Sequence, residues 1–302
     1  MNFADSFALG LGGRGRLRVK LCPNERLAMI LVHPDQARLY CQSAMSEAEA
    51  HQIAGGVAVV FSGACPERGS PNEDSAALIP FDATSGVVVV ADGMGGTRGG
   101  EQASALAVKA LRESLAEAAR TGAAMRTAIL DGIESASRAV SALGVGAATT
   151  LAAVEVQGDR VRPYHVGDSM ILVMGQRGKI KLQTVSHSPV GFAVEAGVLD
   201  AAEAMHHEDR HLVSNVLGAS DMRIEVGSSL KLARRDTLLL SSDGLFDNLH
   251  TDEVVARLCK GPLASGVRRL AEDSVQRMMR PAEGEPSKPD DLTFVAFRRA
   301  PR

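Results

Sequence analysis

The sequence of 302 residues contains no tryptophan and only two tyrosines. Aromatic platforms on which single-stranded nucleic acid could stack are therefore not expected. Lysine and arginine number 33 against 36 aspartates and glutamates, which gives a net charge of −3 and no basic field for a phosphate backbone. We therefore expect no nucleic acid among the partners of this protein.

Long hydrophobic runs are also missing. The longest apolar stretches, VAVVF, VVVVA and TLLL, are far shorter than the ~20 residues that a bilayer span requires. The N-terminus shows no basic-then-apolar signal pattern. We therefore expect no membrane partner and a cytoplasmic location.

Cysteine is sparse, and Cys22, Cys41, Cys65 and Cys259 form no CxxC pair. This pattern favours reduced structural thiols over a disulfide framework or a zinc knuckle. The composition, 45% hydrophobic and 23% charged, is that of a globular protein with a sizeable core. We predict one catalytic domain over residues 56–299, preceded by an extension, 1–55, of unclear structure.

A run of four valines leads into the most informative stretch, VVVVADGMGG (87–96). Consecutive β-branched residues are typical of a strand covered on both faces. The strand would end at Asp92, and the glycines behind it let the backbone turn tightly. Taken alone, the stretch is equally well an ordinary Asp-Gly turn.

The rest of the chain alternates between strand and helix patterns. Residues 57–62 and 75–80 are predicted to form a hairpin whose bend carries Arg68, Glu73 and Asp74. Apolar stripes at helical spacing predict helices over 99–120 and 123–142. Segment 43–54 is polar and indicates a short helix or a linker. Antiparallel strands follow from residue 144, so the fold class is α+β rather than a simple βαβ repeat.

Aspartates recur at the ends of the predicted apolar strands. If these ends converge, the carboxylates would repel one another strongly unless hard cations neutralise them. Ligands that are all oxygen select Mg²⁺ or Mn²⁺ over zinc, and two such ions ~4 Å apart can activate water and orient a phosphate. Arg68 would supply a planar donor fork for phosphate oxygens. The aspartates concerned are Asp74, Asp92, Asp168, Asp243 and Asp290.

The motifs around these aspartates occur in a familiar order. They are Asn72-Glu73-Asp74, VVVVADGMGGTRGGEQAS (87–104), GAATTLAAV (146–154), HVGDS (165–169), LLLSSDGLFD (238–247) and PDDLTF (289–294). Across residues 57–299 this order resembles the metal-dependent protein phosphatase family, type 2C, in its bacterial form. Six ordered motifs are far more specific than any single one.

The resemblance implies a four-layer α-β-β-α sandwich in which two five-stranded antiparallel sheets are flanked by helices. It also implies a protein serine/threonine phosphatase in which water bridging two Mn²⁺ or Mg²⁺ ions attacks phosphorus. Phosphorylated proteins, either serine/threonine kinases or their targets, would be the substrates.

The resemblance assigns the metal ligands by motif. Asp92 would bridge both ions, and the Gly93 carbonyl would bind one of them. Asp243 and Asp290 would complete the shell of the other, with Asp74 and Glu73 close by through water. A weaker third ion would sit at Asp168, Asp243 and Asp247.

Three positions depart from the family pattern. Arg68 lies six residues before Asp74 instead of five, and Met94 stands where many eukaryotic members have a histidine that acts as general acid. Asp291 replaces the usual asparagine after Asp290 and adds charge beside the metals. We expect this charge to alter metal affinity without abolishing activity.

Two other readings compete with the phosphatase. His207-Glu208-Asp209-Arg210-His211 spells HExxH, the zinc-peptidase signature, in which His207 and His211 would bind zinc and Glu208 would activate water. This reading leaves the strand-end aspartates unexplained and offers no obvious third ligand. A catalytically silent module of the same fold is the other alternative.

Overall fold

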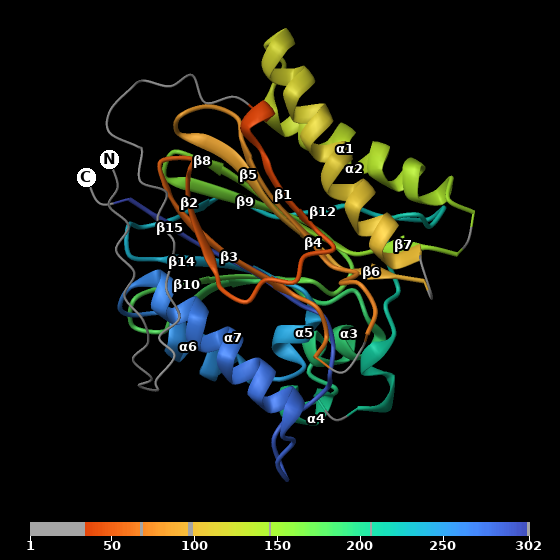
Figure 1. Ribbon diagram of the computed structural model, residues 1–302, viewed down its shortest axis with the longest axis vertical. Coiled ribbons are helices and arrows are strands. Elements are labelled where there is room, and N and C mark those ends of the chain that lie inside the picture. Colours follow the sequence, from red (N-terminus) through yellow and green to blue (C-terminus); the bar gives the residue numbers. More distant parts are fainter. Residues whose placement is uncertain (1–33, 67–68, 96–98, 145, 206, 301–302) are drawn as a thin grey trace, which may run out of the picture.

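Two antiparallel sheets pack face to face, and helices cover the outer face of each (Figure 1). This computed structural model describes residues 34–66, 69–95, 99–144, 146–205 and 207–300. The predicted α+β sandwich of four layers is therefore confirmed. The sheets have more strands than the five apiece that the resemblance implied, because short strands extend their edges.

One sheet has seven strands, and the order β1-β4-β5-β8-β9-β12 runs across it, with β13 also paired to β9. Its strands are β1 (Arg38–Cys41), β4 (Ser75–Pro80), β5 (Ser85–Ala91), β8 (Leu151–Gln157), β9 (Arg160–Val166), β12 (Glu225–Val226) and β13 (Leu230–Lys231).

The other sheet has six strands in the order β11-β10-β14-β15-β3-β2. Its strands are β2 (Glu49–Ile53), β3 (Gly56–Gly63), β10 (Met170–Met174), β11 (Ile180–Gln183), β14 (Thr237–Ser241) and β15 (Leu292–Arg299). A separate two-stranded ribbon joins β6 (Gly93–Met94) to β7 (Ala148–Thr149).

Helices α1 (Gly99–Thr121) and α2 (Met125–Ser141) cover the seven-stranded sheet, which confirms the two predicted helices. Helices α6 (Thr251–Leu258) and α7 (Leu263–Met279) cover the six-stranded sheet (Figure 1). Shorter helices are η1 (Pro34–Gln36), α3 (Pro189–Glu195), α4 (Ala201–Ala204), η2 (Glu208–His211) and α5 (Asp243–Phe246).

The valine run of β5 explains how the layers hold together. Val88 and Val90 belong to the apolar cluster between the two sheets, whereas Val87 and Val89 belong to the cluster under α1 and α2. Successive side chains of a strand point to opposite faces, so a strand covered on both sides must be apolar at every position. All four valines are almost fully buried, as the sequence predicted.

The predicted hairpin of 57–62 with 75–80 is wrong. β3 lies in the six-stranded sheet and β4 in the seven-stranded sheet, so the chain crosses between sheets in the loop that separates them. The partner of β4 is β5 instead, with Ser75 opposite Ala91. Alternating apolar residues identify a strand but do not say which neighbour it pairs with.

The expected helix or linker at 43–54 is wrong for Glu49–Ile53, which forms edge strand β2, paired along its length with β3. Residues 43–48 form an irregular connection between β1 and β2. Strands β1 and β2 thus bring the described part of the N-terminal segment into the two sheets. Residues 1–33 lie outside the described residues. The domain boundary at residue 56 stays a prediction.

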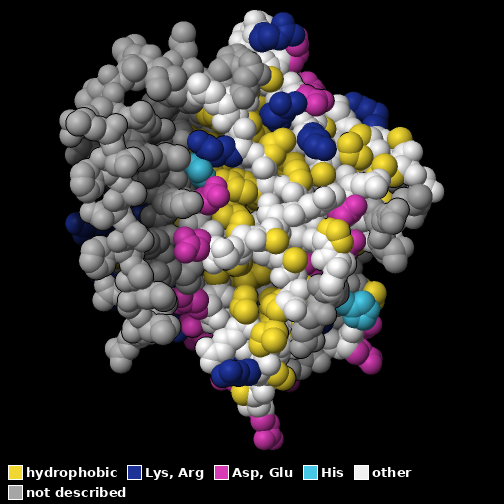
Figure 2. Space-filling view, in the orientation of Figure 1, with side chains coloured by type: hydrophobic (Ala, Val, Ile, Leu, Met, Phe, Trp, Pro, Cys, Tyr) yellow, Lys and Arg dark blue, Asp and Glu magenta, His cyan; other side chains and the backbone are white. Residues whose placement is uncertain are grey.

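In Figure 2, apolar side chains gather in a band down the middle of the described face, and acidic and basic side chains lie mostly around it. Within the described residues, we find no helix with the length and apolar character that crossing a bilayer demands.

Candidate metal centre and active site

Both sheets deliver aspartates to one end of the sandwich. In the seven-stranded sheet, Asp74 precedes β4 and Asp92 follows β5, and the pairing of Ser75 with Ala91 makes these two positions neighbours. In the six-stranded sheet, β14 pairs with β15 so that Ser241 faces Phe294. Asp243 follows β14 and Asp290 precedes β15, which brings this second pair of carboxylates to the adjacent strand ends.

A hydrogen bond between the sheets joins the two pairs. The Ser242 hydroxyl donates to Oδ2 of Asp74 over 2.7 Å. Ser242 is itself fixed because its backbone N–H donates to the Thr293 carbonyl over 2.9 Å. Asp74, Ser242 and Thr293 are all buried. The acidic strand ends therefore meet in one place.

The pKa values of the clustered aspartates reflect how close these carboxylates lie to one another. Burial raises the pKa of Asp92 well above its usual range, and the charges of Asp74, Asp243, Asp168 and Asp290 raise it further. Burial likewise raises the pKa of Asp74, although the Ser242 hydrogen bond opposes that shift. Carboxylates that resist ionisation in this way are stabilised when a cation neutralises them.

Asp168 and Asp247 extend the cluster outward. Asp168 lies in the turn that takes the chain from β9 in one sheet to β10 in the other. Burial, followed by the charge of Asp243, raises the pKa of Asp168 to about 7. Asp247 directly follows α5, and burial together with Asp243 raises its pKa to about 6.

Lys288 lies among these outer aspartates, although no motif of the sequence pointed to it. Its ammonium Nζ is 2.8 Å from Oδ2 of Asp243, 2.8 Å from Oδ2 of Asp247 and 3.1 Å from Oδ2 of Asp290. Burial lowers the pKa of Lys288, but the three carboxylates outweigh that effect and hold the pKa above its ordinary value. The lysine is therefore charged.

The backbone around Asp92 is fixed by hydroxyl groups. The Thr150 hydroxyl accepts a hydrogen bond from the Asp92 N–H over 3.1 Å, and the Thr149 hydroxyl donates to the Asp92 carbonyl over 2.8 Å. Thr150 also contacts the Ser169 hydroxyl over 2.6 Å, next to Asp168. These threonines belong to the GAATTLAAV motif, whose spelling alone did not reveal this role.

Gly93 must be a glycine. A Cβ atom there would lie 2.1 Å from the Gly100 carbonyl oxygen and 2.6 Å from that of Glu73. The first turn of α1 and the loop before β4 therefore approach the Asp92-Gly93 backbone more closely than any side chain allows.

A second glycine, Gly244, allows α5 to pack closely against the start of β15. A Cβ atom on Gly244 would lie 2.0 Å from the carbonyl oxygen of Asp291, so the first turn of α5 packs against the start of β15. The carboxylate of Asp291 accepts backbone N–H groups from Cys65 over 2.7 Å and Glu73 over 2.8 Å. Asp291 thus ties the loop before Asp74 to the start of β15.

The donor chemistry of the cluster fits hard divalent cations. Its side chains offer carboxylate and hydroxyl oxygens, and several of the carboxylates raise one another's pKa. Mg²⁺ and Mn²⁺ prefer such oxygen ligands, whereas zinc prefers histidine and thiolate. Arg68, the expected phosphate donor, lies outside the described residues.

A cavity of about 760 Å³ opens beside the outer aspartates. Asp168, Asp243 and Asp247 line it together with residues of α3 and α4. Arg210 also lines it and lowers the pKa of Asp247. This cavity is large enough for a phosphorylated side chain and its neighbours.

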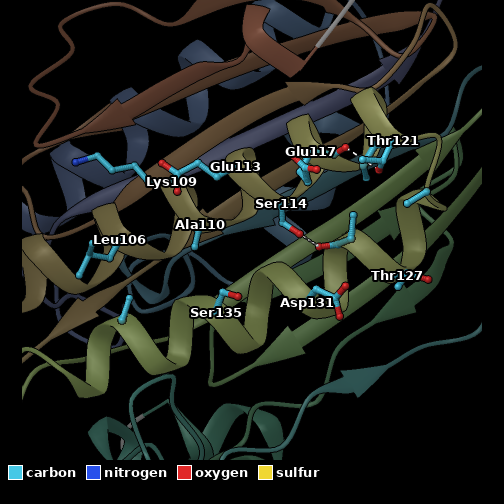
Figure 3. A pocket seen from close by; sticks show the side chains of 14 residues that line it. Leu106, Lys109, Ala110, Glu113, Ser114, Glu117, Thr121, Thr127, Asp131 and Ser135 are labelled. Carbon is cyan, nitrogen blue, oxygen red and sulfur yellow. Dashed lines mark hydrogen bonds between the residues drawn. The ribbon is translucent and has the colours of Figure 1, made fainter.

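A different groove runs between α1 and α2, where the Ser114 hydroxyl donates to the Ala128 carbonyl over 2.7 Å (Figure 3). It is lined mainly by small and acidic side chains, with Lys109 as a basic exception. The aspartates of the metal cluster do not line it, so we do not assign it to the active site.

The HExxH segment does not form a zinc site. Glu208–His211 is a short 3-10 helix, and His207 is its N-cap, with Nδ1 accepting the Asp209 N–H over 3.1 Å. With three residues per turn, positions four apart do not share a face, so His207 and His211 cannot chelate one ion as they would on an α-helix. The segment therefore matches the zinc-peptidase motif in sequence but not in helical geometry.

Comparison with known proteins gives the family. The family model described as "Protein phosphatase 2C" matches residues 64–282. The chain belongs to the protein phosphatase 2C family. The serine/threonine phosphatase Stp of Listeria welshimeri is 31% identical over 183 residues, covering 58% of this chain and 72% of that protein.

Solved structures of 2C phosphatases agree. The S. agalactiae serine/threonine phosphatase superposes with a TM-score of 0.68 at 27% identity, covering 80% of this chain and 98% of the other. The catalytic domain of the phosphatase PstP, crystallised with two manganese ions, gives a TM-score of 0.61 at 25% identity, covering 80% and 96%. The predicted protein serine/threonine phosphatase is confirmed, and the zinc peptidase finds no support.

Proposed function

We propose that this 2C-type phosphatase hydrolyses phosphoserine and phosphothreonine in proteins with two Mn²⁺ or Mg²⁺ ions held at the strand-end aspartates. The observation that carries the proposal is the convergence of Asp74 and Asp92 from one sheet with Asp243 and Asp290 from the other. The charges of Asp243 and Asp290 both raise the pKa of Asp92, although each of these residues lies far from it in the sequence.

We assign the ligands as the family pattern suggests. Asp92 would bridge the two ions, the Gly93 carbonyl would bind one, and Asp243 and Asp290 would complete the other. Asp74 would hold a coordinating water, for which its hydrogen bond from Ser242 orients the carboxylate. When bound, the ions would lower the pKa of water and neutralise phosphate charge.

The residues of the chain would then position the reaction. Ser242, Thr149 and Thr150 keep Asp74 and Asp92 in place through the hydrogen bonds described above. Arg68 would bind the phosphate oxygens. Met94 has no proton to donate. The leaving serine or threonine oxygen would therefore take a proton from water in the site.

The physiological substrates would be serine/threonine kinases or their targets, met in the cytoplasm. The cavity beside Asp168 supports a peptide substrate, because its lining joins the outer aspartates to residues of α3 and α4 and its volume of about 760 Å³ leaves room for residues around the phosphorylated side chain. Residues 187–222 would therefore contribute to substrate choice.

Release of phosphate from a phosphothreonine peptide tests the proposal. The protein should be inactive in EDTA, regain activity with Mn²⁺ or Mg²⁺, and lose it in Asp92→Asn. His207→Ala, which leaves the aspartates unchanged, should retain the activity. Manganese binding without any phosphate release would instead identify a catalytically silent module, and zinc retained in a His207-dependent way would favour a peptidase.

A further inference from the structure

We propose that His187 is a positioning residue for phosphopeptide substrates, because it joins the turn that carries Asp168 to the wall of the cavity beside the aspartates. The inference rests on the proposed function, since it presumes that the peptide around the phosphorylated residue lies in this cavity. His187 itself is buried. Its two neighbours in the chain, Ser186 and Ser188, line the cavity.

His187 holds both backbone polar groups of Gly167. The His187 N–H donates to the Gly167 carbonyl over 2.9 Å, and Nδ1 of the His187 ring accepts the Gly167 N–H over 3.0 Å. Gly167 directly precedes Asp168, which lines the cavity. A shift of His187 would therefore break both bonds at the place where the Asp168 turn meets the cavity wall.

The tautomer of His187 follows from these contacts. A backbone N–H can only donate, so Nδ1 accepts and the neutral ring carries its proton on Nε2. Nε2 lies 2.9 Å from Oε2 of Glu225 and donates to it. Glu225 is exposed, so this bond contributes less than the buried bond to Gly167. Nδ1 is therefore the ring atom on which the arrangement depends.

His187 also holds the helix that forms this wall. It precedes Ser188, the N-cap of α3, and its ring stacks on that of Phe192 in the same helix, with centroids 6.3 Å apart. Val190 and Val194 of α3 line the cavity. A phosphopeptide that reaches the aspartates would meet these side chains.

The segment after η2, residues 212–222, is attached to the same residue. The N–H and the hydroxyl of Ser214 both donate to the His187 carbonyl over 2.8 Å, and Nδ2 of Asn215 donates to Nδ1 over 2.9 Å. The ring of His165 packs against that of His187 with centroids 4.4 Å apart. Burial lowers the pKa of His165 to about 3, so this ring is neutral. The Asp168 turn, α3 and residues 212–222 thus meet at His187.

Two substitutions isolate the role of Nδ1. In His187→Asn the amide oxygen can take the place of Nδ1, whereas in His187→Gln the polar atoms take the place of Nε2 and the Gly167 N–H loses its acceptor. Both variants lose the ring, so the difference between them reports the bond to Gly167. We would measure kcat and KM for a phosphothreonine peptide with several residues on each side, and for p-nitrophenyl phosphate, a small ester that does not need the wall.

His187→Gln should raise the KM for the peptide roughly five- to thirtyfold, the range expected for the loss of one buried hydrogen bond. Its kcat for both substrates and its KM for p-nitrophenyl phosphate should stay as in the wild type. His187→Asn should restore most of the peptide KM. A KM that rises equally for both substrates, or equal behaviour of the two variants, would overturn the inference.

Ser214→Ala provides the test if thermal unfolding in EDTA shows that His187→Gln does not fold. It removes one of the two donors to the His187 carbonyl, so it should raise the KM for the peptide alone, by a smaller factor. The matched control is Ser137→Ala, which removes a different hydroxyl bond of the same segment, the one that accepts the Gly218 N–H over 3.1 Å. Its peptide KM should be that of the wild type.

An unchanged peptide KM in Ser214→Ala, or the same rise in Ser137→Ala, would contradict the role of His187. If the wild type turns over both substrates normally in these samples, the proposed function stands despite that result. A wild type that releases phosphate from neither substrate would overturn the proposed function and this inference together.

Discussion

The hydroxyl of Ser242 lies 2.7 Å from Oδ2 of Asp74, and this hydrogen bond connects the six-stranded sheet to the seven-stranded sheet at the acidic end of the sandwich. Both residues are almost fully buried. The bond also lowers the pKa of a carboxyl whose pKa burial raises well above its usual range. Ser242 therefore helps to keep Asp74 available as an anion.

Removing this hydroxyl should weaken both stability and metal binding. Ser242→Ala leaves Asp74 without its buried donor, which costs roughly 1–3 kcal/mol of the free energy of unfolding. Urea unfolding in EDTA measures the loss, and a manganese titration should show weaker binding. Ser229→Ala, which affects a surface contact with Arg160, is the control. Unchanged manganese affinity in Ser242→Ala would contradict the assigned role.

Two substitutions of Asp291 should separate the structural effect of its side chain from its electrostatic effect. Asp291→Ala leaves the N–H groups of Cys65 and Glu73 without acceptors and should destabilise the protein by about 2 kcal/mol or more. Asp291→Asn keeps one acceptor oxygen but removes a charge that raises the pKa of Asp74.

The asparagine variant should therefore change manganese affinity and remain active in the phosphopeptide assay. Parallel measurements of unfolding and metal affinity on the two variants distinguish the effects. A wild type that is inactive until Asp291→Asn restores it would show that the aspartate is inhibitory, contrary to our expectation.

Gly244 should tolerate no side chain. In Gly244→Ala the new Cβ would meet the Asp291 carbonyl at 2.0 Å, so α5 must shift and carry Asp243 with it. We expect a loss of about 1–3 kcal/mol in unfolding free energy and weaker manganese binding. Gly175→Ala is the control, because its Cβ would make only ordinary contacts, the nearest at 3.4 Å. Equal stability of the two variants would argue against the close packing.

The metal-free protein should lose stability as the pH rises from 6 to 8. The pKa of Asp168 is raised to about 7 in the folded chain, so folding favours its protonated form and that contribution disappears as the pH passes through this value. Each kcal/mol lost lowers the melting temperature by roughly 2–4 °C in a domain of this size.

Asp168→Asn removes this titrating group and also a charge that raises the pKa of Asp92, and both changes reduce the loss of stability with pH. The remaining titrating groups are present in both proteins. Burial lowers the pKa of His165 to about 3, for example, and its contribution has the opposite sign below pH 6.5. Melting curves in EDTA should therefore fall less steeply with pH for Asp168→Asn than for the wild type. Parallel curves would refute the assignment of the shift to Asp168.

Local patterns predicted the buried strands, helices α1 and α2, and the aspartates at the ends of apolar strands, whereas the four layers and the shared metal site were expected from the resemblance to the phosphatase family. The valines of β5 report burial on two faces, and Asp92 and Asp243 follow apolar strands. Pairing between strands is not local, which is why β3 and β4 were wrongly joined in a hairpin. HExxH likewise matched in spelling, although its residues fold as a 3-10 helix.

The supporting residues of the site could not be found in this way. Ser242, Thr150 and Asp291 act through hydrogen bonds to residues more than fifty positions away. Lys288 lies in a polar loop after α7, and only the folded chain brings it to Asp243 and Asp247. A lysine next to Pro289 and Asp290 carried no recognisable pattern, although its place beside the last motif could have raised the question.

The most direct test of the paired-ion site is a crystal of the protein soaked in Mn²⁺, measured near the manganese absorption edge. Two anomalous peaks ~4 Å apart, with a carboxylate oxygen of Asp92 in reach of both, is the predicted result. Manganese absent from Asp92, or a single ion there at saturating concentration, would contradict the two-ion account of phosphate hydrolysis.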